Sequence, residues 1–222
     1  MILSLFIKPF MNCRFLVWPL FSCIFFLTIA STRFKTTQPH EATFTYLKYA
    51  VEIQDKNIGW MTCSKTISSV DPSITNYLLD SKVIINIITT YTIQFNSNTS
   101  YKYNDLYKAN YATKVNGDTQ SFSTINWDGS KYLGWDGTNN KVISEKITLS
   151  IGNLYFKEPV GVTQLFSEKY MEMCPIIHTG EYYTVTFPDG ITTTYKYQNG
   201  ICIWVESKQK LYKLVFRLKE IK

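Results

Sequence analysis

Short turn motifs divide much of this chain into segments that suit strands. Pro188-Asp189-Gly190 and Asn199-Gly200 are the clearest, and Asn116-Gly117, Asp128-Gly129 and Asp136-Gly137 repeat the chemistry. Glycine takes positive φ without steric cost, and Asn or Asp tolerates the neighbouring turn conformations, so each motif reverses the chain tightly. Turns at this spacing predict many short antiparallel strands.

Residues between the turns alternate in polarity with the period of a β-strand. From Thr43 to Gln54, for example, every second residue is apolar or β-branched on one side, which is the pattern of a half-buried strand. The long run Ile74–Thr92 is rich in Val, Ile, Thr and Tyr. These residues lose side-chain freedom in a helix and suit a pleated surface, so the run is predicted as one strand. The other predicted strands are Trp60–Val70, Leu106–Val115, Ser121–Trp127, Lys131–Trp135, Tyr182–Phe187, Ile191–Tyr197, Ile201–Glu206 and Leu211–Ile221.

A partial helical stripe occurs between Pro159 and Met173. It predicts a short helix around Gln164–Met171 that lies across an opening of the sheet. The fold class that follows is all-β and mainly antiparallel. We expect a strongly curved meander sheet or incomplete β-barrel with one short helical segment.

Residues 1–31 have the pattern of an export signal peptide. Lys8 and Arg14 precede an apolar run, Phe15–Ile29, which small residues follow. The alternative is a retained membrane anchor, but the run is shorter than the ~20 residues that a span needs. We therefore expect an exported protein that is periplasmic or envelope-associated after signal removal.

The remaining chain is predicted to hold one domain. Residues 32–40 are polar and without periodicity, as in a flexible tether, and residues 41–222 form the single antiparallel β domain. Met11 is an alternative start that gives a signal of more ordinary length.

Composition excludes several classes of protein. The 222 residues are 45% hydrophobic and 18% charged, which is typical of a globular domain. Loss of residues 1–31 lowers the basic count from 23 to 21 against 17 acidic residues, a net charge of +4. This is too mild to indicate nucleic-acid binding. We expect a monomer without a cofactor.

Cysteine and histidine usage gives no metal site. The predicted mature chain has Cys63, Cys174 and Cys202, no CxxC motif, and the distant histidines His40 and His178. One disulfide with a free thiol and three unpaired core thiols are both open at this point.

Several motifs resemble a family of uncharacterised exported proteins of Gram-negative bacteria, a domain of unknown function. The residues that carry the resemblance are Ile58-Gly59, Leu154-Tyr155-Phe156-Lys157-Glu158-Pro159, Phe166-Ser167-Glu168, Phe187-Pro188-Asp189-Gly190 and Tyr195-Lys196-Tyr197-Gln198-Asn199-Gly200. The resemblance extends from about Tyr46 to Leu218 and includes no catalytic signature. It implies a curved antiparallel sheet, with a distant likeness to the half-barrels of lipoprotein carriers. Likeness of fold assigns no activity.

Three polar residues are candidates for acid/base chemistry. Glu158, Glu168 and His178 would form a catalytic group if they met at one opening, because burial and mutual repulsion separate the pKa values of neighbouring carboxylates. The alternative is a set of separate structural roles, with Glu158 bonded to backbone N–H groups, Glu168 on a surface and His178 near a turn. No spacing in the sequence brings the three together.

Aromatic residues are the stronger compositional signal, with 16 Tyr and 14 Phe. Their rings can line a concave surface for a hydrophobic ligand, stack against sugars, or pack as the core of a twisted sheet. The residues predicted to bind such a ligand are Trp60, Trp127, Trp135, Tyr182, Tyr195 and Trp204.

The last predicted strand carries a basic strip, Lys213, Arg217 and Lys219. It is either a solvated face that discourages edge pairing or a contact for an anionic envelope surface.

The function favoured by the sequence is noncatalytic. We expect the protein to bind a hydrophobic or lipid-like ligand on the concave face of its sheet or to serve envelope maintenance. One alternative is a hydrolase or isomerase that uses Glu158, Glu168 and His178. The other is a protein-interaction module that pairs through an edge strand.

Overall fold

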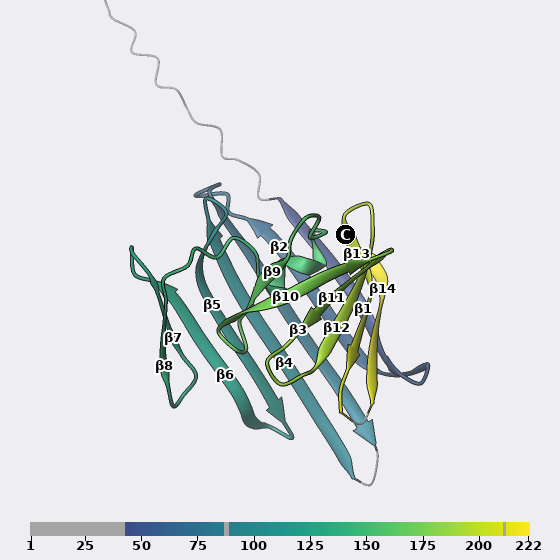
Figure 1. Ribbon diagram of the computed structural model, residues 1–222. Helices are drawn as coiled ribbons and strands as arrows, with labels where there is room; N and C mark the ends of the chain where they lie inside the picture. The colour runs from purple at the N-terminus through teal and green to yellow at the C-terminus, as the bar shows by residue number, and fades with distance from the viewer. Residues whose placement is uncertain (1–42, 87–88, 211) are drawn as a thin grey trace, which may run out of the picture. The chain divides into compact units, whose positions relative to one another are not determined.

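The protein is an antiparallel sheet with one short helix (Figure 1), here described from a computed structural model over residues 43–86, 89–210 and 212–222. The first eight strands are β1 (Phe44–Ile53), β2 (Lys56–Ile67), β3 (Ile74–Asn86), β4 (Thr90–Lys102), β5 (Asp105–Val115), β6 (Asp118–Trp127), β7 (Tyr132–Trp135) and β8 (Asn140–Ile143). The 3-10 helix η1 (Ile151–Tyr155) follows, and then β9 (Gln164–Ser167), β10 (Glu172–Thr179), β11 (Tyr182–Thr186), β12 (Thr192–Gln198), β13 (Ile201–Lys208) and β14 (Lys213–Ile221).

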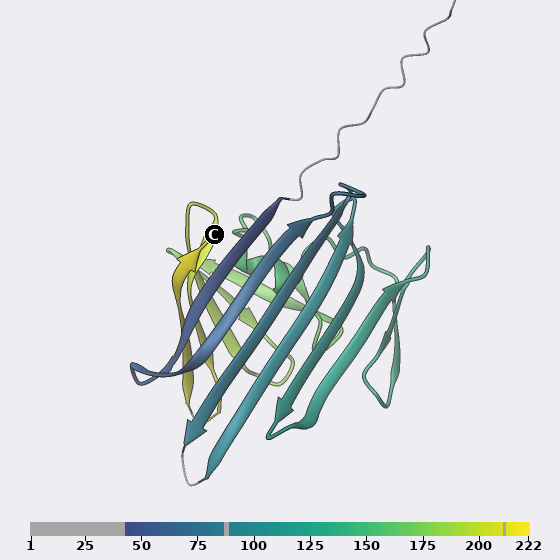
Figure 2. The same ribbon diagram turned by 180° about the vertical axis from the view of Figure 1, so that it is seen from behind.

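The sheet consists of two meanders that share one seam. Its order is β8-β7-β6-β5-β4-β3-β2-β1-β14-β13-β12-β11-β10-β9, so β1 and β14 join the first meander to the second. The long strands β1–β6 form one broad surface, as the view from behind shows (Figure 2), and β9–β13 lie in front of it (Figure 1). The sheet therefore curls so that its inner face becomes concave.

The two edge strands, β8 and β9, do not pair with each other, so the barrel is incomplete. The segment between them partly fills the gap. The Leu106 N–H donates to the carbonyl of Ile147 (2.8 Å), and the Phe166 N–H donates to the carbonyl of Leu149 (3.0 Å). The predicted all-β fold, an incomplete barrel with one short helical segment, is confirmed.

Alternation along the strands assigns each side chain to one face of the sheet. In β3, Leu79, Ser81 and Val83 are buried, whereas the intervening Lys82 and Ile84 are exposed. The period of two places the first set on the concave face and the second on the outer face.

The predicted turns are confirmed. Asn199 and Gly200 both have positive φ (53° and 78°) between β12 and β13, as a two-residue hairpin loop requires. At another turn the Asp128 carboxylate accepts the N–H groups of Ser130 (2.8 Å) and Lys131 (2.9 Å), and these bonds lower the pKa of Asp128.

Two details of the sequence prediction are wrong. The stretch Gln164–Met171 contains strand β9 and a turn instead of a helix, because Leu165 and Phe166 are buried by pairing with β10, and the helical turn lies earlier, at η1. The run Ile74–Thr92 is not one strand but enters a hairpin, in which the Thr90 hydroxyl donates to Asn86 Oδ1 (2.8 Å). No glycine or proline marks that reversal in the sequence.

Two apolar clusters hold the fold together. The larger one joins β1–β3 and β10–β13 to η1, with Tyr49, Leu79 and Tyr195 among its buried members. The smaller one joins the β4–β6 side to β9 around Ile125 and Phe166. The core thus fills one end of the curl, beside η1.

The predicted signal (residues 1–31) and tether (residues 32–40) lie outside the described residues. Within the described part of the chain, no helix has the length and apolar character that a membrane crossing requires.

We expect Gly59→Ala to destabilise the fold far more than Gly134→Ala. A Cβ at Gly59 would lie 2.1 Å from the carbonyl oxygen of Lys82 and 2.8 Å from Val83 Cα, both backbone atoms of the adjacent strand. At Gly134 it would lie 2.6 Å from the Met171 sulfur, which can shift because the side chain is flexible, and at an ordinary contact distance of 3.5 Å from the backbone oxygen of Lys141. Overpacking of this kind costs about 1–3 kcal/mol or more, and urea unfolding of both variants measures it. Equal losses would contradict the assignment of the clash to backbone.

Candidate functional site

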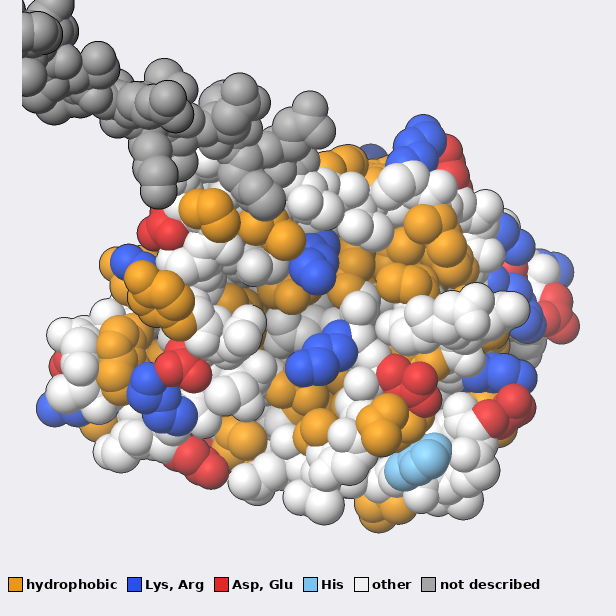
Figure 3. Space-filling model, turned by 90° about the horizontal axis from the view of Figure 1, so that it is seen from above, with side chains coloured by type: hydrophobic (Ala, Val, Ile, Leu, Met, Phe, Trp, Pro, Cys, Tyr) orange, Lys and Arg blue, Asp and Glu red, His pale blue; other side chains and the backbone are white. Residues whose placement is uncertain are grey.

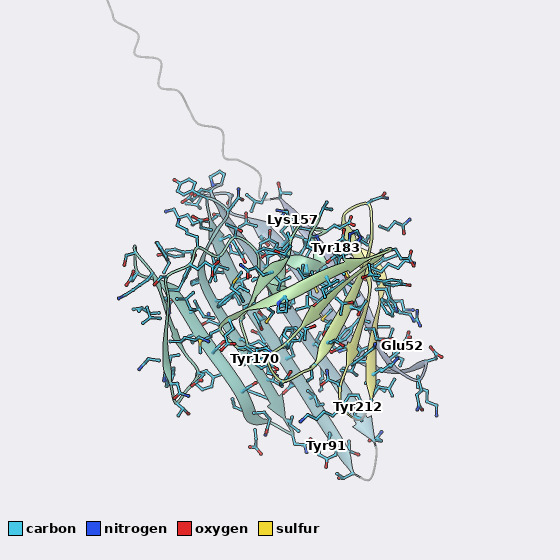
Figure 4. The ribbon with its side chains drawn as sticks, viewed as in Figure 1. Glu52, Tyr91, Lys157, Tyr170, Tyr183 and Tyr212 are labelled. Carbon is cyan, nitrogen blue, oxygen red and sulfur yellow. The ribbon has the colours of Figure 1, made fainter. Side chains whose placement is uncertain are left out.

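The concave face of the sheet encloses a cavity of about 590 Å³. Strands β2–β6 supply one side, β12–β14 supply the other, and η1 closes one end. Its apolar lining includes Met61, Val83, Ile93, Phe95, Leu214 and Phe216. Figure 4 places Tyr212 at the opposite end of the sheet from η1, and we call this end the mouth.

Helix η1 forms the closed end of the cavity with aromatic packing behind it. Ile151 and Tyr155 line the space. The Tyr155 ring contacts Tyr49 (centroids 5.7 Å apart) and Tyr195 (6.2 Å), both edge to face. The hydroxyl of Tyr49 donates to the backbone carbonyl of Cys202 (2.7 Å), so the buried phenol is satisfied.

A buried carboxyl group, Glu168, lies beside η1 with an exposed fraction of 2%. The Ser150 hydroxyl donates to Glu168 Oε1 (2.6 Å), and the Gly152 N–H donates to the same atom (3.1 Å). Tyr101 in turn donates to the Ser150 hydroxyl oxygen (2.8 Å). A Cβ at Gly152 would lie 3.1 Å from Thr99 Oγ1 and 3.3 Å from Glu168 Oε1, so glycine permits the close approach.

Burial dominates the electrostatics of Glu168. Removal from water raises the pKa of this carboxyl, and the hydrogen bonds from Ser150 and Gly152 offset the rise only in part. The carboxyl is therefore protonated at pH values where an exposed glutamate is ionised.

A polar clasp fixes the cavity wall near the turn between β11 and β12. Lys169 Nζ donates to the Tyr170 hydroxyl (2.7 Å) and lies 3.6 Å from the Asp189 carboxylate, to which the Tyr170 hydroxyl also donates. The Tyr170 ring packs on Phe187, with centroids 5.7 Å apart. These contacts tie the segment after β9 to the hairpin across the cavity.

The three acid/base candidates do not meet. Glu158 Oε1 accepts a hydrogen bond from the Tyr183 hydroxyl (2.9 Å), and the His178 ring stacks on the Tyr183 ring with centroids 4.2 Å apart. Glu168 belongs instead to the network with Ser150. The structure thus places Glu158 and His178 beside one tyrosine and places Glu168 at the cavity.

Of the six aromatic residues predicted to bind a ligand, Tyr195 lines the cavity. Trp60 lies on the outer face, beside Ala50 in a shallow hollow of about 430 Å³. Tyr182 and Trp204 also lie on the outer face, where their ring centroids are 5.9 Å apart.

The remaining two tryptophans lie toward the β7–β8 edge. Trp127 packs against Tyr132 (centroids 4.7 Å apart), and Trp135 packs against Phe122 (5.1 Å). The expectation that all six rings share one concave surface is therefore not met, because strand alternation sends them to different faces.

The basic strip of β14 is paired with carboxylates. Lys213 lies 3.4 Å from Glu206, Arg217 Nε donates to Glu52 (2.8 Å), and Lys219 lies 3.8 Å from Glu52. Strand β14 is also internal to the sheet, between β1 and β13. Viewed from above, basic and acidic side chains are intermixed on the surface (Figure 3). Contact with an anionic envelope surface stays a prediction.

Cys63, Cys174 and Cys202 are free and buried. Burial raises the pKa of the Cys174 thiol to about 11 and that of Cys202 to about 12. In the ranges that the structure describes, no group of three or more His, Cys, Asp or Glu side chains is arranged to hold a metal ion.

The sequence analysis missed the partners of Glu168, which are Ser150 and Gly152, and the Tyr101 hydroxyl that donates to Ser150. These residues are separated from Glu168 along the chain, and only the fold brings them to one place. The available signal was the segment Ser150-Ile151-Gly152-Asn153, with three small or polar residues, directly before the Leu154–Pro159 motif.

We expect the parent protein to lose stability as the pH rises because of Glu168, and Glu168→Gln to remove this loss. The raised pKa means that the folded protein keeps a proton that the unfolded chain loses above the ordinary value of 4.5. The free energy of unfolding therefore falls, by at most about 1.4 kcal/mol per pH unit, between that value and the pKa of the folded state.

Denaturant unfolding of both proteins from pH 4 to pH 9 measures this effect. The difference between Glu168→Gln and the parent isolates Glu168 from other titrating groups, and it should grow in favour of the variant as the pH rises. A difference that is constant with pH would show that Glu168 titrates normally.

The comparisons with known proteins agree with this fold. A search of curated proteins finds no match. A crystal structure described as a β-barrel-like protein of the domain of unknown function DUF1849, from Brucella abortus, is similar in fold, with a TM-score of 0.52 and 12% identity. The likeness covers 81% of this chain and 97% of that chain. The family model for the domain of unknown function DUF6134 matches residues 49–219. The chain therefore belongs to the DUF6134 family.

Proposed function

We propose that this protein binds a hydrophobic or lipid-like molecule in the cavity of its incomplete barrel. The observation that carries the proposal is a cavity of about 590 Å³ with a largely apolar lining on the concave face. Ligand sites of small molecules span about 300–1,000 Å³, so the space suits one such ligand.

Burial of apolar ligand surface would supply the binding free energy, at about 25 cal/mol for each Å² removed from water. The walls are strands of one hydrogen-bonded sheet, and η1 and the clasp at Tyr170 fix the space further. A preformed site of this kind limits the ordering cost of binding.

The observations favour this function over the two alternatives. An interaction module that works by strand pairing needs a long open edge, whereas the edge strands β8 and β9 have four residues each. The enzyme hypothesis rested on a group of Glu158, Glu168 and His178, and Glu168 is separate from the other two.

Envelope placement is part of the proposal and rests on the sequence of residues 1–31. Expression of the full chain in a Gram-negative host should yield a periplasmic product whose mass matches a chain that begins at Thr32. Acidic substitution of Lys8 and Arg14 should lower the exported fraction, because signal peptides need a basic start. A full-length product in the cytoplasm would contradict export.

A bulky residue at the mouth should weaken ligand binding. Ile93 faces the cavity and is half-buried, so Ile93→Trp would fill the entrance. We expect the affinity for the apolar dye N-phenyl-1-naphthylamine, measured by fluorescence titration, to fall at least tenfold, equivalent to about 1.4 kcal/mol.

Gln94→Trp is the matched control, since Gln94 is the next residue of β4 and is exposed on the outer face. It should keep dye affinity within about twofold of the parent. Equal dye binding by both variants, or none by the parent, would overturn the cavity as the binding site.

A further inference from the structure

We propose that the closed end of the cavity is a subsite for an uncharged, hydroxyl-bearing head group. An amphiphile would enter head first and leave its apolar chain toward the mouth. This inference rests on the proposed function and adds to it the chemical class of the ligand, a neutral single-chain lipid with a polyol head.

Polarity rises with depth along the wall formed by β3–β6. Nearest the mouth, the register aligns three apolar residues, Val83, Ile93 and Val115. The next inward row contains Ser81, Phe95, Thr113 and Ser121, and the row after it contains Leu79, Ser97, Tyr111 and Ser123. A chain-like apolar group therefore matches the mouth, and a polar group matches the interior.

Three serine residues line the deeper part of the cavity. Ser81, Ser97 and Ser167 line the cavity with exposed fractions of only 7%, 3% and 1%. All three belong to the deeper part of the wall, on β3, on β4 and at the end of β9. Nearly all buried polar groups in proteins have a partner, so serine hydroxyls at this depth suit a ligand group that forms hydrogen bonds with them.

The opposite wall behaves differently. The Thr193 hydroxyl donates to Ser207 (3.1 Å), and the Gln209 amide also donates to Ser207 (2.8 Å). Thr193, Ser207 and Gln209 thus form a hydrogen-bonded group on that wall. The deep serine residues of the cavity lie apart from this group, on β3, β4 and β9.

Glu168 selects against an anionic head. It follows Ser167 directly and lines the cavity, and its Oε1 atom accepts hydrogen bonds from the Ser150 hydroxyl and the Gly152 N–H. A ligand carboxylate at this depth would meet a second carboxyl group. Lys169 also lines the cavity, but its ammonium group donates to the Tyr170 hydroxyl and lies 3.6 Å from the Asp189 carboxylate, which already pairs its charge. Burial also raises the pKa of Glu168, which equips it to donate a hydrogen bond to a hydroxyl.

The test compares three amphiphiles of equal chain length, monododecanoylglycerol, dodecanoate and dodecylamine. Calorimetric titration into the full chain at pH 8, below the micellar concentrations, should show at least tenfold tighter binding of monododecanoylglycerol than of either charged compound. Tighter or equal binding of dodecanoate or dodecylamine would overturn the inference.

Variants assign the selectivity to named groups. Ser81→Ala with Ser97→Ala should reduce the tenfold preference to less than threefold, and Ser97→Ala alone should give an intermediate value. Ser64→Ala, the same change on the outer face of β2, should keep the full preference. An unchanged preference in the double variant would show that these hydroxyls do not bind the head group.

The dye titration separates the two hypotheses. If the dye and the charged amphiphiles bind but the glycerol lipid binds no tighter, only the head-group inference fails. If neither the dye nor any amphiphile binds, the proposed function fails and the head-group inference fails with it.

Discussion

The pairing of β1 with β14 is the interaction on which the rest of the structure depends. Each meander could form by local hairpins, but only this ladder joins them into one sheet. It runs from Leu47–Ile221 to Glu52–Val215, with the salt bridge between Arg217 and Glu52 on its outer face. Without it neither the concave face nor the larger core cluster would exist, because that cluster draws residues from both meanders.

The contacts that close one end of the curled sheet also form the proposed site. The segment after β8 bonds to β5 at Leu106 and to β9 at Phe166, which positions η1 over one end of the curl. That placement buries Glu168 against Ser150 and Gly152. A buried carboxyl is costly to a fold unless it is hydrogen-bonded, and such costs are often retained where they serve a site. The proposed site thus contains a buried carboxyl group that the fold holds with hydrogen bonds.

Local chemistry made most of the fold predictable. Turns such as Asn199-Gly200 have a stereochemical cause within two residues, and the alternation from Thr43 to Gln54 fixes faces without tertiary information. Gln164–Met171 was mispredicted because its apolar spacing fits a helix, whereas pairing of Phe166 with Met173 in β10 decides the outcome. The site was largely beyond prediction. Trp60 and Tyr195 are both aromatic residues of predicted strands, and the sequence does not distinguish them. Strand register places Trp60 on the outer face and Tyr195 in the cavity.

Chemical modification of the three buried thiols can show how this sheet opens. Cys63 lies in β2, Cys174 in β10 and Cys202 in β13, so each belongs to a different part of the curl. A buried thiol with a raised pKa reacts with alkylating reagents only when its surroundings open. The order in which the three thiols become modified therefore gives the order in which their surroundings open. It shows whether the β1–β14 pairing breaks first or whether each meander unfolds independently.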